Sequence, residues 1–354
     1  MWFILGCIVF LFFQYYKCSS NTTLSSKNNT FTIVGIIVLT LIVFLKAPTF
    51  GSDDLDNYYR YYNELSLISY QSLFAEFTAV HPRLKEPFFY IVAKPFADIG
   101  IPVQIWVGAI GFLFAYSTMT FTKKYSANSF MSCMILFSLG FLTFSMTGLR
   151  QSVALSIVIL SYNYIQKRKF IPFLLTLFLA SLFHTSSIFF VIAYFVPQRV
   201  FKFKTAASII CGSCVISVFF PSVFRKLIML LGGSTYEAYS ESTTALSWSG
   251  FIIQVSILAI CIFLMQRKLT DSDDNFFLNL MVIALAFQAF RTVVAEAFRI
   301  AIYFSIFEIA VIPNAVYSIR NPRIRKQYQF TIEAVLLLYM LYSRAYAGYR
   351  FFWT

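Results

Sequence analysis

Long apolar runs, separated by short polar segments, recur along the whole chain. A helix needs about 20 predominantly apolar residues to cross the hydrocarbon core of a bilayer. The runs that approach this length are 2–16, 31–48, 103–121, 128–146, 149–165, 205–224, 249–266, 275–294, 298–318 and 327–344. Together with the apolar segment 171–197, they predict an all-α, polytopic integral membrane protein of about 10 to 11 transmembrane helices. Residues 1–354 are therefore expected to form a single membrane domain.

Basic residues in the short loops predict the orientation of these spans, because lysine and arginine concentrate on the cytoplasmic side. The clusters assigned to that side are 123–124, 167–169, 267–268 and 320–326. The spans between them then place two longer segments outside, near residues 51–101 and 225–248. The first is acidic and rich in tyrosine, and it is predicted to contain an external helix that starts near Asp53.

Segment 171–197 does not fit a single span. Basic residues 167–169 precede it, and Arg199, Lys202 and Lys204 follow it, so both flanks have a cytoplasmic pattern. The segment is too short for two full spans. A re-entrant hairpin with its tip near 183–186 resolves the conflict. Non-helical backbone at membrane depth is stable only when it is buried in protein or lines a wet cavity, so such a tip would point to a site.

Composition supports the membrane assignment and removes several function classes. Hydrophobic residues make up 59% of the chain and charged residues 12%, about half the charged fraction of a soluble domain. The net charge of +13 lies mostly between apolar runs, so it indicates topology rather than a nucleic-acid partner. None of the six cysteines forms a paired metal motif with a nearby histidine, so no metal is predicted. Walker and dinucleotide motifs are also absent, and no cofactor is expected.

Each charged residue inside an apolar run raises the free energy of membrane insertion by about 3 kcal/mol, so such residues are candidates for a functional role. Arg150 follows Gly148 at the outer end of a span and precedes Gln151. It is either an interfacial arginine that snorkels or an anion ligand, since the guanidinium fork matches phosphate oxygens. His184 stands at the proposed hairpin tip, followed by hydroxyl residues. It is either a hydrogen-bonded packing residue or a general base.

A third group lies on a late helix. Glu296, Arg299 and Tyr303 share one helix face, and Arg291 precedes them. The group is either a structural salt bridge or a guanidinium set held ready for a diphosphate. Glu86, which precedes Pro87, follows the external segment, and Pro87 is a suitable first residue for a helix.

These residues occur in an order that resembles a known family. The pieces that carry the resemblance are 51–53 with Tyr58 and Tyr62, 86–90, 148–151, 168–169, 183–186, and Arg299 with Tyr303 and Pro313. The chain resembles the EpsG-type branch of bacterial polysaccharide repeat-unit polymerases, the Wzy-like proteins. The resemblance extends over about residues 50–320.

The resemblance implies a metal-independent glycosyltransferase of the bacterial inner membrane. Such an enzyme joins oligosaccharide repeats carried on undecaprenyl diphosphate at the periplasmic face, and so makes O-antigen, capsule or exopolysaccharide. The growing chain leaves its diphosphate and is transferred to a sugar hydroxyl of a new lipid-linked unit. The expected partners are these lipid-linked oligosaccharides, membrane lipids and a chain-length regulator.

On this basis each candidate residue receives an expected role. The leaving diphosphate needs positive charge, for which Arg150, Arg291 and Arg299 are the candidates. The acceptor hydroxyl needs a base, for which His184 is the first candidate, followed by Asp53, Asp56 and Glu86. The residues expected to position sugars are Asp56, Tyr58, Tyr62, Gln151, Glu296 and Tyr303.

Two other functions share most of these features. A lipid-linked oligosaccharide flippase or another transporter would also carry membrane arginines, but along a path to both faces, whereas here they gather toward one side. An O-antigen ligase-like transferase would use the same chemistry with another acceptor, which the sequence does not show. A purely structural membrane protein leaves the buried charges without a purpose.

Overall fold

The computed structural model describes residues 1–21, 24–51, 53–78, 86–223, 226, 248–265, 272–294 and 297–354. Over these ranges the chain is built from helices, and an isolated antiparallel bridge joins Lys46 to Phe351. In chain order the elements are α1 (Trp2–Asn21), α2 (Leu24–Leu45), α3 (Asp53–Glu64), η1 (Leu65–Leu67), α4 (Tyr70–Ala75), α5 (Pro87–Asp98), α6 (Val103–Tyr125), α7 (Ser129–Ser138), α8 (Phe141–Thr147), α9 (Leu149–Gln166), α10 (Phe170–Phe183), η2 (Thr185–Val191), α11 (Ile192–Phe195), α12 (Phe203–Phe219), α15 (Ser249–Met265), α16 (Ser272–Ala289), η4 (Phe290–Thr292), α17 (Ala297–Ser305), α18 (Glu308–Tyr317) and α19 (Pro322–Tyr342). The predicted all-α class is confirmed.

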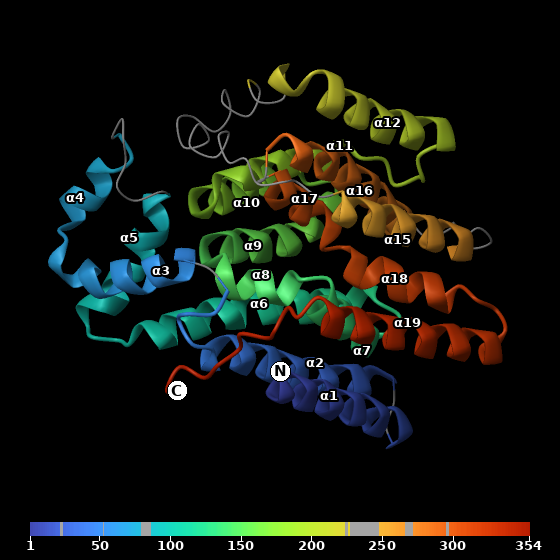
Figure 1. The fold of residues 1–354 in the computed structure, drawn as a ribbon, viewed down its shortest axis with the longest axis horizontal. Helices are drawn as coiled ribbons and strands as arrows, with labels where there is room; N and C mark the ends of the chain where they lie inside the picture. Colours follow the sequence, from blue (N-terminus) through green and yellow to red (C-terminus); the bar gives the residue numbers. More distant parts are fainter. Residues whose placement is uncertain are drawn as a thin grey trace.

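The long helices form a bundle whose axes run across the view in Figure 1. α1 and α2 lie along one side of the bundle and α12 along the other, while α3, α4 and α5 gather at one end. Glycine lets α2 and α6 approach closely. A Cβ at Gly108 would stand 2.7 Å from Phe44 Cδ2, and one at Gly111 would stand 2.6 Å from Val43 Cβ. Small residues at such contacts are typical of helices that associate within lipid.

Two helices in the described ranges are long and apolar enough to cross a bilayer, Val103–Tyr125 and Asp273–Thr292. If each of two bent helix pairs is one span, the number rises to four. The apolar runs predict about 10 to 11 spans. Most of the others correspond to apolar helices of 10–17 residues, which at 1.5 Å per residue reach about 15–26 Å, less than the hydrocarbon thickness of about 30 Å. These shorter helices are Trp2–Lys17, Asn29–Leu45, Phe170–Phe183, Thr185–Phe195, Phe203–Phe219 and Ser249–Met265.

The bent pairs divide two runs that the sequence predicts as continuous. α7 and α8 meet at 57°, and α17 and α18 meet at 43°. The first break falls at Leu139 and Gly140, where Gly140 has φ +86°, a conformation that side chains disfavour. Apolar periodicity does not report such a break, because residues on both sides of it remain apolar.

The segment after Arg168 forms the predicted hairpin. α10 ends at His184, whose backbone is extended (φ −156°, ψ 111°), and the chain then returns as η2 and α11. The Arg168 guanidinium donates a 3.1 Å hydrogen bond to the carbonyl of Tyr194, and the rings of Phe173 and Tyr194 stack at 5.4 Å. The tip therefore carries His184, and each arm is about 20 Å long.

Polar contacts join several helix ends at the end of the bundle opposite α3–α5. The Tyr125 hydroxyl donates to Gln166, and Asn314 donates to Asp274 and to the carbonyl of Tyr125. These residues lie beside the basic loops that the sequence assigns to one side. Arg150, at the other end of α9, is about 24 Å from Gln166 along the helix.

Candidate active site

Glu86 joins the external segment to the bundle. It stands directly before Pro87, which begins α5 as predicted because its missing N–H costs nothing at a helix start. Glu86 itself has φ 54° and ψ 63°, in the left-handed region that residues other than glycine rarely adopt. Such a backbone costs about 1–3 kcal/mol and persists where surrounding contacts hold it.

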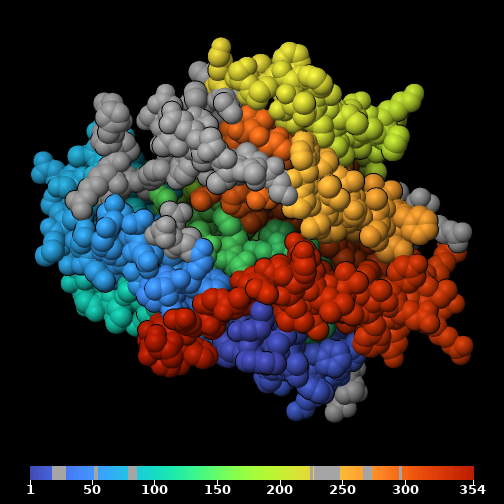
Figure 2. Space-filling view, in the orientation of Figure 1, coloured from blue at the N-terminus to red at the C-terminus, as the bar shows by residue number. Residues whose placement is uncertain are grey.

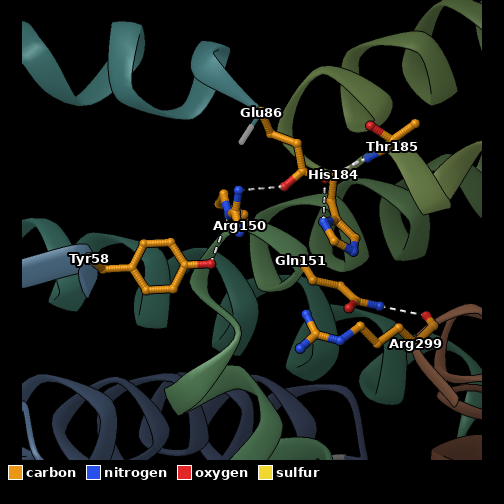
Figure 3. Close-up of polar contacts among 7 residues, drawn as sticks. All are labelled: Tyr58, Glu86, Arg150, Gln151, His184, Thr185 and Arg299. Atoms are coloured by element: carbon orange, nitrogen blue, oxygen red, sulfur yellow. Dashed lines mark hydrogen bonds and ion pairs between the residues drawn. The ribbon is translucent and has the colours of Figure 1, made fainter. Parts of the chain in front are cut away.

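The contacts that hold Glu86 come from two other parts of the chain. Its Oε2 lies 3.0 Å from Nη1 of Arg150, and its Oε1 lies 2.6 Å from Nδ1 of His184. The backbone N–H of Thr185 donates a 2.9 Å hydrogen bond to the same Oε1. Figure 3 shows the carboxylate between the start of α9 and the hairpin tip, with both basic side chains directed at it.

Opposing effects set the pKa of Glu86. Burial raises this pKa, whereas the charges of His184 and Arg150 and the hydrogen bonds from His184 and Thr185 lower it. The attractive contacts outweigh burial and bring the pKa from 4.5 to about 2. Glu86 is therefore a carboxylate at neutral pH, and its Oε1 can accept a hydrogen bond from an N–H at Nδ1 of His184.

His184 has one ring nitrogen engaged and one open. The residue is 8% exposed, and its Nδ1 faces Glu86. Its Nε2 is buried and has no hydrogen-bond partner among the described residues. A carboxylate at Nδ1 favours the tautomer with the proton on Nδ1, which leaves the lone pair of Nε2 available to accept a proton.

Arg150 connects Glu86 to the external helix α3. Its Nε donates a 2.8 Å hydrogen bond to the hydroxyl of Tyr58, which projects from α3. The Arg150 side chain is 15% exposed, so it lies within the cluster instead of snorkelling to solvent. Its charge is already balanced by Glu86, which makes it an organiser of the cluster as well as a candidate anion ligand.

Gln151 and Arg299 form the remaining side of the cluster. The Gln151 amide nitrogen donates a 2.6 Å hydrogen bond to the carbonyl of Arg299 in α17. Gln151 Oε1 is buried without a partner in the described part of the chain. Figure 3 shows the Arg299 guanidinium extending beneath Gln151. An imidazole, two guanidinium groups and an amide thus come together from α9, α17 and the hairpin tip (Figure 3).

A family model described as the EpsG family matches residues 28–353. The chain belongs to the EpsG family. No curated protein and no solved structure matches this chain. The match covers every element of the cluster, and it supports a polysaccharide polymerase-like role for this membrane protein.

The other predicted site residues of this EpsG protein differ in their surroundings. The Tyr62 hydroxyl donates to the carbonyl of Ile101, and Asp56 is exposed on α3. Tyr303 lies fully buried in α17. The side chain of Asp53 and the whole of Glu296 lie outside the described residues.

The guanidinium groups of Arg291 and Arg299 each lie 5.8 Å from the centre of the Phe298 ring. Arg291 also lines a cavity of about 510 Å³, to which Glu86, Arg150 and His184 do not contribute. The described residues contain no group of three or more histidine, cysteine, aspartate or glutamate side chains able to hold a metal ion.

The sequence treats His184 and Glu86 as alternative bases, whereas the structure makes them partners. No local pattern predicts this pairing, because 98 positions separate the two residues. The cavity residues Gln254 and Gln288 were also not predicted, since a glutamine in an apolar run carries no distinctive signal. Two charged residues in apolar runs indicate this region: Arg291, which the sequence singles out, and Glu308, and both line the cavity.

Proposed function

We propose that this EpsG-family chain is a glycosyltransferase of the bacterial inner membrane that polymerises oligosaccharide repeats carried on undecaprenyl diphosphate. Family membership supports the polymerase role, and the periplasmic face is the side on which α3–α5 lie in this proposal. The observation that carries the catalytic assignment is the Glu86–His184 pair: Nε2 of His184 is buried without a partner among the described residues, and Glu86 also contacts Arg150.

In the proposed reaction, Nε2 of His184 accepts the proton of an acceptor sugar hydroxyl. The hydroxyl oxygen forms a bond to the anomeric carbon of the donor chain, and the bond from that carbon to the diphosphate oxygen breaks. The electron pair leaves with the diphosphate, which stays attached to its polyprenyl chain. The departing charge requires cations, and Arg299 and Arg291 are the candidates. Glu86 stabilises the imidazolium that forms, and the proton then passes to the diphosphate or to water.

The direct test uses the purified full chain in detergent with lipid-linked repeats from polysaccharide-producing cells. A ladder of lengthened products on a gel is expected without added nucleotide, and EDTA should leave the ladder unchanged. If EDTA abolishes the ladder and magnesium restores it, metal independence is wrong. If the repeats cross a liposome bilayer but never lengthen, the chain is a transporter and the proposed function is wrong.

Orientation gives a separate prediction. Ser72 in α4 and Gln327 in α19 are both exposed and lie toward opposite ends of the bundle (Figure 1). In a background without native cysteines, Ser72→Cys should react with a membrane-impermeant maleimide in intact spheroplasts. Gln327→Cys should react only after permeabilisation, because the basic cluster 320–326 keeps that end in the cytoplasm. Reaction of Gln327→Cys alone in intact spheroplasts would reverse the orientation.

A further inference from the structure

The cavity of about 510 Å³ lies where both bent helix pairs break. Leu139, Gly140 and Phe141 line it at the first break, and Ser305 and Glu308 line it at the second. Its volume is within the range of about 300–1,000 Å³ that is usual for small-molecule sites. Interrupted helices at membrane depth commonly border ligand cavities, because the freed backbone groups then face polar partners.

Polar side chains reach the cavity from four helices. Glu308 at the start of α18 is 2% exposed, and its Oε1 accepts a 2.8 Å hydrogen bond from Gln254 in α15. Gln288 of α16 and Thr143 of α8 also line the cavity. Carboxylate and amide oxygens accept hydrogen bonds from hydroxyl groups, and amide nitrogens donate to them. This set suits a ligand with several hydroxyl groups.

Aromatic and apolar side chains form the rest of the wall. They are Phe50, Leu139, Phe141, Phe144, Ile253, Ile257, Phe298, Ala301 and Ile302. Sugar rings combine apolar C–H faces with a rim of hydroxyl groups, so they match a wall of rings and apolar chains with a few polar groups. A purely apolar ligand would leave the buried Glu308 carboxylate in contact with hydrocarbon, which is costly.

One guanidinium also faces this space. Among the described residues no carboxylate lies within 4 Å of Arg291, and its guanidinium lies 5.8 Å from the centre of the Phe298 ring. The same ring contacts Arg299, which belongs to the His184 cluster through the hydrogen bond from Gln151. Phe298 lines the cavity and also contacts Arg299 of the cluster, so the two adjoin. A guanidinium that lines a cavity is suited to bind phosphate oxygens, because its planar fork of donors matches them.

The cavity opens on the side of the bundle. Figure 2 shows a hollow framed by blue, orange and red atoms, with green atoms of the central helices at its floor. These colours correspond to the lining residues near 50, 250–257 and 298–308, 339–345, and 139–147. Because the helix axes run across this view, the hollow faces sideways (Figure 1), the direction in which a bilayer surrounds a membrane protein. A ligand with a prenyl tail can therefore leave that tail in the lipid.

We propose that this cavity binds the diphosphate and the adjoining sugar of the lipid-linked donor. Arg291 pairs with the diphosphate, and the Glu308–Gln254 pair bonds to sugar hydroxyls. The inference rests on the proposed function and places the donor's diphosphate next to the His184 cluster. The donor enters the cavity from the membrane, and the acceptor hydroxyl meets His184 in the adjoining cluster.

The first test measures protection of a single cysteine by farnesyl diphosphate, a short prenyl diphosphate. Ser305→Cys, in a background without native cysteines, should react with a small methanethiosulfonate because Ser305 lines the cavity. The matched control Ser117→Cys lies fully buried in α6 outside the cavity and should stay unreactive. Farnesyl diphosphate should slow the reaction of Ser305→Cys about tenfold or more. Adding Arg291→Gln should remove this protection, whereas adding Arg323→Gln, at the opposite end of the bundle, should not.

A second variant tests sugar recognition. Glu308→Gln should leave protection by farnesyl diphosphate intact but raise the KM for lipid-linked repeats by about tenfold, the usual effect of losing a hydrogen bond to a charged group. Intact farnesyl protection also reports that the variant is folded. Absence of protection in wild type, or equal protection with Arg291→Gln, would overturn the diphosphate assignment. An unchanged KM in Glu308→Gln would overturn the sugar assignment.

The two proposals can fail independently. A ladder of products without cysteine protection retains the glycosyltransferase and removes the donor from this cavity. Protection that depends on Arg291, without any ladder, retains a prenyl diphosphate site and refutes the polymerase.

Discussion

Replacing His184 by glutamine is expected to slow chain extension by about 10²- to 10⁴-fold, the range that a positioned general base usually contributes. The glutamine amide can still donate a hydrogen bond to Glu86, so the hairpin tip should keep its contacts. It has no nitrogen lone pair comparable to that of Nε2, so the acceptor hydroxyl loses its base. The measurement is the initial rate of ladder growth with saturating lipid-linked repeats, which reports kcat.

A second variant separates chemistry from packing at this position. His184→Ala should be as slow as His184→Gln, but added imidazole should restore part of its rate, because the vacated space lies beside Glu86. A histidine that only fills space would show no such rescue. Extension at the wild-type rate in His184→Gln would exclude the residue as the base and leave Asp53 and Asp56 as candidates.

The second large effect is expected for Glu86→Gln. Glutamine removes the negative charge that holds Nδ1 of His184 protonated and that balances Arg150. We expect kcat to fall by about 100-fold or more while KM changes little, because the variant impairs orientation of the base rather than substrate binding. Breaking a buried ion pair also destabilises a protein by about 3–5 kcal/mol. The Glu86–Arg150 pair is partly exposed, so we expect a loss of stability near about 3 kcal/mol. Glu86→Asp should recover part of kcat.

The stability effect of Glu86 has a defined pH dependence. A carboxyl with a lowered pKa stabilises the fold above its unfolded value, here 4.5, and loses that contribution as pH falls toward its folded value of about 2. The difference in melting temperature between wild type and Glu86→Gln should shrink as the pH falls below 4.5. A difference that stays constant down to pH 3 would contradict the assigned role.

Charge patterns predict parts of this fold that hydrophobicity does not. The basic flanks of 171–197 predict the hairpin, and the structure places His184 at its tip. The apolar runs predict the helices, of which two in the described ranges, or four if each bent pair is one span, are long and apolar enough to cross a bilayer. The apolar runs do not predict the break at Gly140, because a left-handed φ at one glycine does not change the hydropathy of the surrounding residues.

The candidate site was predicted as individual residues rather than as an arrangement. Arg150 and His184 stand out because membranes disfavour them. Their common contact with Glu86 depends on how α5, α9 and the hairpin pack, which is tertiary information. Arg291 was grouped with Arg299 by sequence proximity; both guanidinium groups lie 5.8 Å from the Phe298 ring, but Arg291 lines the cavity and Arg299 does not.

The link between Tyr58, Glu86 and the bundle has a consequence for wasteful hydrolysis of the donor. Glu86 and Tyr58 belong to the external segment, while His184 and Arg150 belong to the bundle, so the base is complete only when the two parts are docked. On the proposed mechanism, an undocked external segment admits water but leaves His184 without its carboxylate. Water then reaches the site only when His184 cannot act as a base. The bond between the donor sugar and its diphosphate is therefore not hydrolysed, and the donor stays available for the next acceptor.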